Sequence, residues 1–95
     1  MVETTKVEGE KDEHKVKVFT LSTCGWCKKT KKLLEKEGVE YEYVDIDLLE
    51  GDERKEIMAE FKKFDPKKNC PTIVVDEGDT VIVGYMEDEI KEVLC

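Results

Sequence analysis

Two cysteines separated by two residues, in the segment Cys24-Gly25-Trp26-Cys27, constrain the fold of this chain more than any other feature. Before them, residues 15–21 alternate in polarity and then become apolar, which is typical of a β-strand. After them, the sequence predicts a helix that begins near Thr23 or Cys24 and ends at Gly38. The cysteine pair is therefore expected at the amino end of a helix that follows a strand.

The rest of the chain continues this alternation of strands and helices. Apolar periodicity and turn residues predict a second strand, a second helix ended by Pro66, a pair of strands joined by a short loop, and a closing helix that begins at Glu87 or Asp88. The order predicts an α/β fold whose first two strands are parallel and whose last two are antiparallel neighbours. The strands are expected over residues 39–47, 72–75 and 80–83, and the helices from Gly51 and over 87–94.

The length of the chain, 95 residues, suits one small domain, which we expect over residues 15–95. Residues 1–14 are polar, charged and without periodicity, so they predict a mobile charged tail. His14, the single histidine, lies at the edge of this segment and is expected to be solvated rather than to have a specific role.

Charge and hydropathy limit the partners of this chain. A formal net charge of −8 argues against nucleic acid, because phosphate binding needs a positive surface. No segment approaches the roughly 20 apolar residues that span a bilayer, and the first residues lack the apolar core of a secretory signal. We therefore expect a cytoplasmic monomer that binds neither membrane nor nucleic acid.

The spacing of Cys24 and Cys27 gives them unequal roles. At a helix start the two residues lie about one turn apart, so their sulfur atoms can form a disulfide with little backbone movement. Unpaired N–H groups and the helix dipole favour a thiolate at Cys24, so we expect its pKa to be lowered. Cys27 is expected to be less exposed. Cys24 would then attack a target disulfide, and Cys27 would resolve the mixed disulfide.

The residues around the pair suggest further contacts. Trp26 is expected on the exposed lip of the site, where it would shield the sulfur, contact a bound partner or simply pack. A group of lysines follows at once, and they either stabilise the thiolate and attract anionic partners or form a solvated helix face. These lysines are Lys28, Lys29, Lys31 and Lys32.

A C-x-x-C pair also matches half of a zinc site. The usual second half, another C-x-x-C or a histidine pair, is absent from the sequence. Only His14, Cys70 and Cys95 remain as further ligands, so we expect no structural metal.

Three motifs together resemble the glutaredoxins of the thioredoxin superfamily: the strand–Cys24-Gly25-Trp26-Cys27–helix unit, Cys70-Pro71-Thr72, and Gly84-Tyr85-Met86-Glu87-Asp88. The resemblance implies a thioredoxin-like α/β fold, order βαβαββα, with a four-stranded mixed sheet flanked by three helices. It also implies a thiol–disulfide oxidoreductase that needs no cofactor, with glutathione as a candidate co-substrate. The implied partners are disulfide-containing proteins, and the electron donor would be glutathione or a thioredoxin-reductase-type protein.

The resemblance extends the site beyond the cysteine pair. It implies that Pro71 is a cis-proline packed against the active-site cysteines, and that the backbone of Cys70 pairs with a bound peptide or with glutathione. Asp88 matches the position that holds the γ-glutamyl end of glutathione. Together with Trp26, these residues form the expected substrate-binding set.

Three departures from the family pattern affect the expected donor. The dipeptide Gly25-Trp26 replaces the Pro-Tyr that is common in glutaredoxins. The stretch Thr20–Thr23 has no lysine to hold the glycine carboxylate of glutathione. Tyr85 replaces a second glycine after Gly84, as in glutaredoxin-like redoxins that serve ribonucleotide reductase and take electrons from thioredoxin reductase. Both donors therefore stay open.

A cis Pro71 would bring Cys70 close to Cys24 and Cys27. The third thiol could compete for the Cys24 mixed disulfide, or it could be a small buried residue without a redox role. As an alternative function, the three cysteines would bind a metal or an iron–sulfur cluster, with Cys95, glutathione or a partner chain as fourth ligand. Cys95 is otherwise expected to be an incidental thiol at the chain end.

Overall fold

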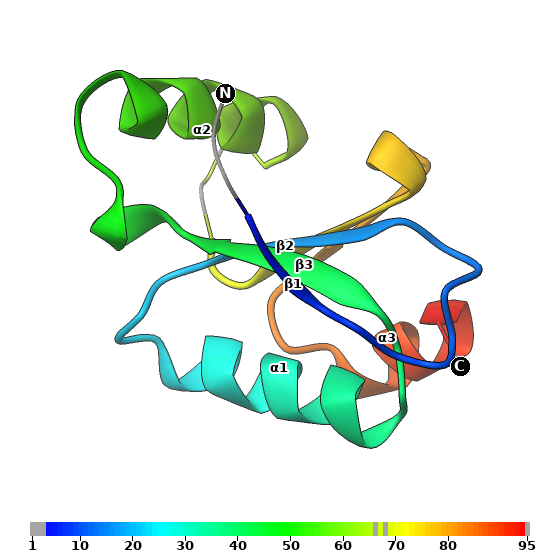
Figure 1. Cartoon of the computed structure of the whole chain (residues 1–95). Helices are drawn as coiled ribbons and strands as arrows, with labels where there is room; N and C mark the ends of the chain where they lie inside the picture. The colour runs from blue at the N-terminus through cyan, green and yellow to red at the C-terminus, as the bar shows by residue number, and fades with distance from the viewer. Residues whose placement is uncertain (1–3, 66, 68, 95) are drawn as a thin grey trace.

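A computed structural model describes residues 4–65, 67 and 69–94 of the chain. It has a five-stranded mixed sheet in the order β1-β3-β2-β4-β5 and three α-helices (Figure 1). The elements in chain order are β1 Thr5–Val7, β2 Val16–Thr20, α1 Gly25–Lys36, β3 Tyr41–Asp45, α2 Gly51–Phe64, β4 Thr72–Val75, β5 Thr80–Val83 and α3 Glu87–Leu94, with short 3-10 helices at Ile46–Leu48 and Asp76–Gly78.

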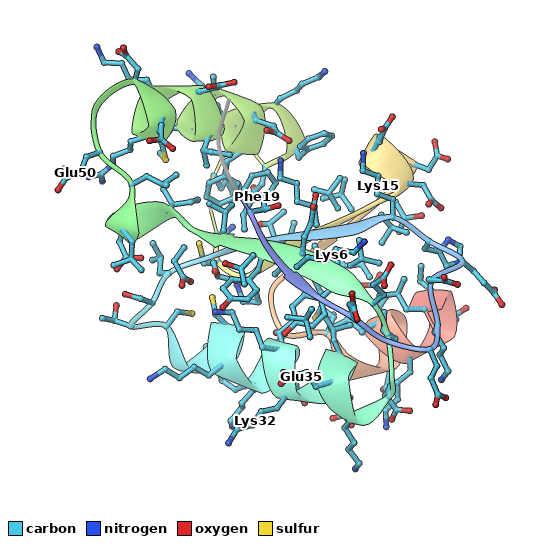
Figure 2. All side chains as sticks on the ribbon, in the orientation of Figure 1. Lys6, Lys15, Phe19, Lys32, Glu35 and Glu50 are labelled. Atoms are coloured by element: carbon cyan, nitrogen blue, oxygen red, sulfur yellow. The ribbon has the colours of Figure 1, made fainter. Side chains whose placement is uncertain are left out.

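The sheet is covered on both faces, with α1 and α3 on one side and α2 on the other (Figure 1). Successive strand residues point to opposite faces, so the buried strand side chains divide into two apolar clusters. Val18 and Ile73 belong to the larger cluster, with Leu34 of α1 and Ile90 of α3. On the α2 face, Phe19 (labelled in Figure 2) stacks on a phenylalanine of α2, Phe61, and the two ring centroids are 5.1 Å apart.

The element order confirms the predicted thioredoxin-like fold. The first two predicted strands, β2 and β3, are parallel, whereas β2 with β4 and β4 with β5 are antiparallel. Helix α1 ends at Lys36, and Gly38 follows with a φ of 72°, a left-handed conformation that favours glycine. Helix α2 ends at Phe64. Pro66, the predicted stop of this helix, lies outside the described residues.

The expectation of four strands is wrong by one. Residues 5–7, which we predicted to be part of a tail, form β1 and pair antiparallel with β3 in the register Thr5↔Tyr43 and Val7↔Tyr41. His14, which we expected to be solvated, also makes a long-range contact, because its Nδ1 lies 2.8 Å from Oδ2 of Asp76. Both interactions join residues far apart in sequence, so the local pattern of a polar segment does not reveal them.

The N-terminal segment also contacts the turn after α1, and Gly9 makes this close approach. A Cβ atom at Gly9 would lie 2.6 Å from the Gly38 carbonyl oxygen and 2.7 Å from the Glu40 backbone nitrogen. Because these neighbours are backbone atoms, the segment would have to move away. We expect Gly9→Ala to lower the free energy of unfolding by about 1–2 kcal/mol, measured by urea denaturation.

Gly25→Ala is the matched control, because a Cβ atom at Gly25 would meet nothing within 4 Å. It should leave the free energy of unfolding unchanged or raise it slightly. Equal unfolding midpoints for Gly9→Ala and the parent would show that the close approach of Gly9 contributes nothing to stability.

Within the described ranges, no helix combines the length and the apolar character needed to cross a membrane.

Candidate active site

Cys24 is the N-cap residue of α1, as the sequence predicts. Its backbone is extended, with φ −81° and ψ 116°, and the helix begins at the next residue. The sulfur takes the place of the oxygen that usually caps a helix, and it accepts a hydrogen bond from the backbone N–H of Cys27 over 3.3 Å. The backbone N–H of Cys24 donates to the Leu21 carbonyl over 3.1 Å, which fixes the turn between β2 and α1.

Cys27 lies one helical turn further on and is fully buried, whereas Cys24 is half-exposed. The predicted difference in exposure is thus present. Cys70 joins them from the loop before β4, and its bond to Pro71 is cis, which confirms the expectation from the resemblance. We call these three residues the thiol cluster.

Two kinds of contact connect the thiol cluster. The Cys24 thiol lies 3.9 Å from the Cys70 carbonyl oxygen, to which it can donate. The Cys27 side chain is close enough to interact with the side chains of both Cys24 and Cys70. Cys27 is therefore the central sulfur of the cluster, and the other two flank it.

These contacts set the ionisation of the thiols. Burial raises the pKa of Cys24, and the hydrogen bond to the Cys27 side chain raises it further. Hydrogen bonds from backbone N–H groups lower the pKa of Cys24, but by less, so the net effect is a rise. The expectation of a lowered pKa at Cys24 is therefore wrong. Interaction with the Cys70 side chain raises the pKa of Cys27, and the same interaction lowers the pKa of Cys70. The ionised form is favoured at Cys70, because its partner Cys27 donates to it.

Asp65 positions the loop that carries Cys70, and sequence reasoning missed it. Its carboxylate is buried and accepts hydrogen bonds from the backbone N–H groups of Lys67, over 3.1 Å, and Asn69, over 2.7 Å. It also lies 3.3 Å from Oγ1 of the buried Thr72. An aspartate directly after a helix and just before a turn was the available signal, because such side chains often bond to the following backbone.

Trp26 lies at the lip of the site, where 56% of its surface is exposed. Its ring stacks on Tyr85 with centroids 5.7 Å apart, and Nζ of Lys29 lies 4.7 Å from its ring centre. Beside it is a shallow cavity of about 230 Å³, the Cys70 cavity, lined by Trp26, Cys70, Gly84 and Tyr85. The structure thus brings together Trp26 and Cys70 of the expected substrate-binding set.

Asp88, Lys31 and Lys32 are not among the residues that line the Cys70 cavity. Asp88 is exposed in the first turn of α3. Lys31 is engaged elsewhere, since its Nζ lies 3.3 Å from Oδ1 of Asp45 and 3.8 Å from the centre of the Tyr43 ring. Lys32 extends from the outer side of α1, away from the sheet (Figure 2). Among the contacts that shift the pKa of Cys24 most, none comes from a lysine.

In the part of the chain that the structure describes, no group of three or more His, Cys, Asp or Glu side chains is arranged to hold a metal ion. Cys95, a ligand in the alternative metal-binding hypothesis, lies outside the described residues.

The fold is similar to that of two solved proteins from Methanosarcina. Methanoredoxin from Methanosarcina acetivorans is 43% identical, with a TM-score of 0.82 over 87% of this chain and 86% of that chain. The glutaredoxin from Methanosarcina mazei Go1 is 44% identical, with a TM-score of 0.86 over 98% of this chain and 88% of that chain.

Sequence comparison leads to the same family. A glutaredoxin-like 8.6 kDa protein from the rubredoxin operon of Clostridium pasteurianum is 29% identical over 79 residues, which are 83% of this chain and 96% of that protein. The family model for glutaredoxin matches residues 16–79, which is more than half of the chain. With a cysteine pair at the start of α1 and a cis-proline beside it, this chain belongs to the glutaredoxin family of thiol–disulfide oxidoreductases.

Proposed function

We propose that this protein reduces disulfides in other proteins through a cycle at Cys24 and Cys27. The Cys24 thiolate attacks one sulfur of the target disulfide, so a mixed disulfide forms and the other target sulfur leaves as a thiol. Cys27 then loses its proton and attacks Cys24, which releases the second target thiol and leaves a Cys24–Cys27 disulfide. The observation that carries this assignment is the difference in exposure, since only Cys24 of the pair can be reached from solvent.

The Cys70 cavity supports a protein or peptide disulfide as the substrate. It lies directly beside the thiol cluster, and its lining residues include no lysine, arginine, aspartate or glutamate. An apolar stretch of a target chain could therefore lie between Trp26 and Tyr85 on one side and Cys70 on the other. The reduced state of such a dithiol requires a reducing compartment, so we infer a cytoplasmic location.

The same cavity makes glutathione the less favoured electron donor. Glutathione carries charged groups at both ends, and charged ligands bind best where charged side chains or N–H groups receive them. Tyr85 packs against Trp26 at a position where the resemblance implies a glycine, and Asp88 lies outside the lining. We therefore propose a protein donor of the thioredoxin-reductase type, with no cofactor bound by this chain.

Offering each donor separately tests this proposal. Disulfide reduction in a substrate protein would be followed with glutathione plus glutathione reductase, and in parallel with thioredoxin reductase plus NADPH. We expect turnover with thioredoxin reductase and little above background with glutathione. Efficient turnover with glutathione alone would contradict the proposed donor, and no turnover with either donor or with dithiothreitol would contradict the proposed cycle.

The raised pKa of Cys24 predicts a pH dependence for the first step. Only the thiolate attacks, and its fraction falls about tenfold for each pH unit below the pKa. We therefore expect the alkylation rate of Cys24 in the reduced protein to rise steadily with pH above neutrality. Peptide mapping after short exposures to iodoacetamide measures this rate, and a rate that is already constant below neutral pH would contradict it.

A further inference from the structure

The cycle at Cys24 and Cys27 has no step for Cys70, although Cys70 is part of the same thiol cluster. Its carbonyl oxygen lies 3.9 Å from the Cys24 sulfur, and its side chain interacts with that of Cys27. Cys70 is half-exposed and lines the cavity in which we place the substrate. A thiol with these neighbours can take part in exchange with any disulfide that forms at Cys27.

We propose that Cys70 exchanges with the Cys24–Cys27 disulfide, so that the oxidised protein also contains a Cys27–Cys70 disulfide with Cys24 as a free thiol. This inference rests on the proposed function, because the cycle supplies the first disulfide.

The exchange needs no oxidant or reductant. The Cys70 thiol loses its proton, and its sulfur attacks the Cys27 sulfur of the Cys24–Cys27 disulfide. A Cys27–Cys70 bond forms while the Cys24–Cys27 bond breaks, and Cys24 leaves as a thiolate that takes up a proton. One disulfide and one thiol are present before and after the step, so the oxidation state of the protein is unchanged.

The geometry favours attack at Cys27 rather than at Cys24. In the reduced protein Cys27 is the sulfur that interacts with both flanking side chains, whereas Cys24 faces the backbone carbonyl of Cys70. The leaving Cys24 thiolate would keep the hydrogen bond from the backbone N–H of Cys27, which is 3.3 Å away.

This exchange would give the oxidised protein a second activity. With the disulfide moved to Cys27 and Cys70, the half-exposed Cys24 is again a nucleophile. It could form a mixed disulfide with a second substrate before any reduction of the protein takes place. A substrate thiol that attacks this mixed disulfide would release Cys24 and leave a rearranged substrate disulfide, so the protein would exchange substrate disulfides as well as reduce them.

Mapping the free thiol of the oxidised protein tests the exchange. A Cys95→Ser variant leaves three cysteines, Cys24, Cys27 and Cys70, and one disulfide among them leaves one thiol free. The variant would be oxidised with diamide, a thiol oxidant, quenched with acid, and labelled in denaturant with a light maleimide. Reduction and a heavy maleimide would then mark the two sulfurs of the disulfide. Trypsin with chymotrypsin, which cuts after Trp26, separates all three cysteines for mass spectrometry.

We expect the light label on Cys70 in one part of the molecules and on Cys24 in the rest, with more label on Cys24 than in the Cys70→Ser control and none on Cys27. Light label on Cys70 alone would overturn the proposal. Light label on Cys27 would also overturn it, because it would mean that Cys24 and Cys70 pair directly.

Cys70→Ser in the same background is the matched control. Its oxidised form should contain only the Cys24–Cys27 disulfide, so light label on Cys24 there reports incomplete oxidation and is subtracted. The control also separates the two proposals. If it forms no disulfide, the proposed cycle fails; if it forms one while the parent carries light label on Cys70 only, the cycle stands and the exchange is wrong.

Discussion

A Cys24→Ser variant is expected to lose disulfide reduction completely. Cys24 is the half-exposed member of the pair at the start of α1, and a serine hydroxyl cannot replace a thiolate as the attacking group. Cys27 is fully buried and cannot meet a protein disulfide in its place. The measurement is turnover of a protein disulfide with dithiothreitol as donor, which bypasses the choice of natural reductase.

Cys27→Ser is the matched variant, because it removes the second step and leaves the first. It should accumulate a mixed disulfide between Cys24 and the substrate, visible as a mass increase that reducing agent removes. If Cys24→Ser were as active as the parent, or if the trapped substrate were attached to Cys70, Cys24 would not be the attacking residue.

The second large effect is expected at Asp65, which is far from the cysteines in sequence but holds the Cys70 loop. In Asp65→Ala, the backbone N–H groups of Lys67 and Asn69 lose their shared acceptor, whereas the hydroxyl of Thr72 keeps its shorter hydrogen bond, over 2.6 Å, to the Asn69 carbonyl. Hydrogen bonds to a charged group contribute about 1.5–3 kcal/mol each, so we expect a loss of about 3 kcal/mol in the free energy of unfolding. Urea denaturation of the reduced protein measures it.

Asp65→Asn provides a graded comparison. The amide keeps one acceptor oxygen and loses the charge, so the loss of stability should be smaller than for alanine. Alkylation of Cys70 in the folded protein should become faster in both variants as the loop loosens, and fastest in Asp65→Ala. Unchanged unfolding midpoints and unchanged alkylation of Cys70 would show that Asp65 does not position the loop.

Much of this fold follows from local sequence patterns. The helix that begins at Cys24 and ends before Gly38 depends on an N-cap residue, helical periodicity and a left-handed glycine, all within one short segment. The parallel pairing of β2 and β3 follows from the helix between them. Local periodicity and chain connectivity were sufficient for these predictions, and for the difference in exposure between Cys24 and Cys27.

Other features depend on partners that only the folded chain supplies. A three-residue strand such as β1 is recognisable only from its pairing with Tyr41 and Tyr43. Asp65 becomes important because two backbone N–H groups of the loop after α2 donate to its carboxylate.

The cysteine pair likewise has some properties that follow from the local sequence and others that depend on the tertiary structure. The sequence by itself determined that Cys24 and Cys27 lie one helical turn apart at the start of α1, because that follows from helix geometry and capping. The tertiary structure decided which thiol of the cluster ionises most readily, and the favoured residue is Cys70 rather than Cys24. The physical reason is that a thiol pKa depends on burial and on neighbouring donors, and here those neighbours come from segments that are 46 residues apart in sequence.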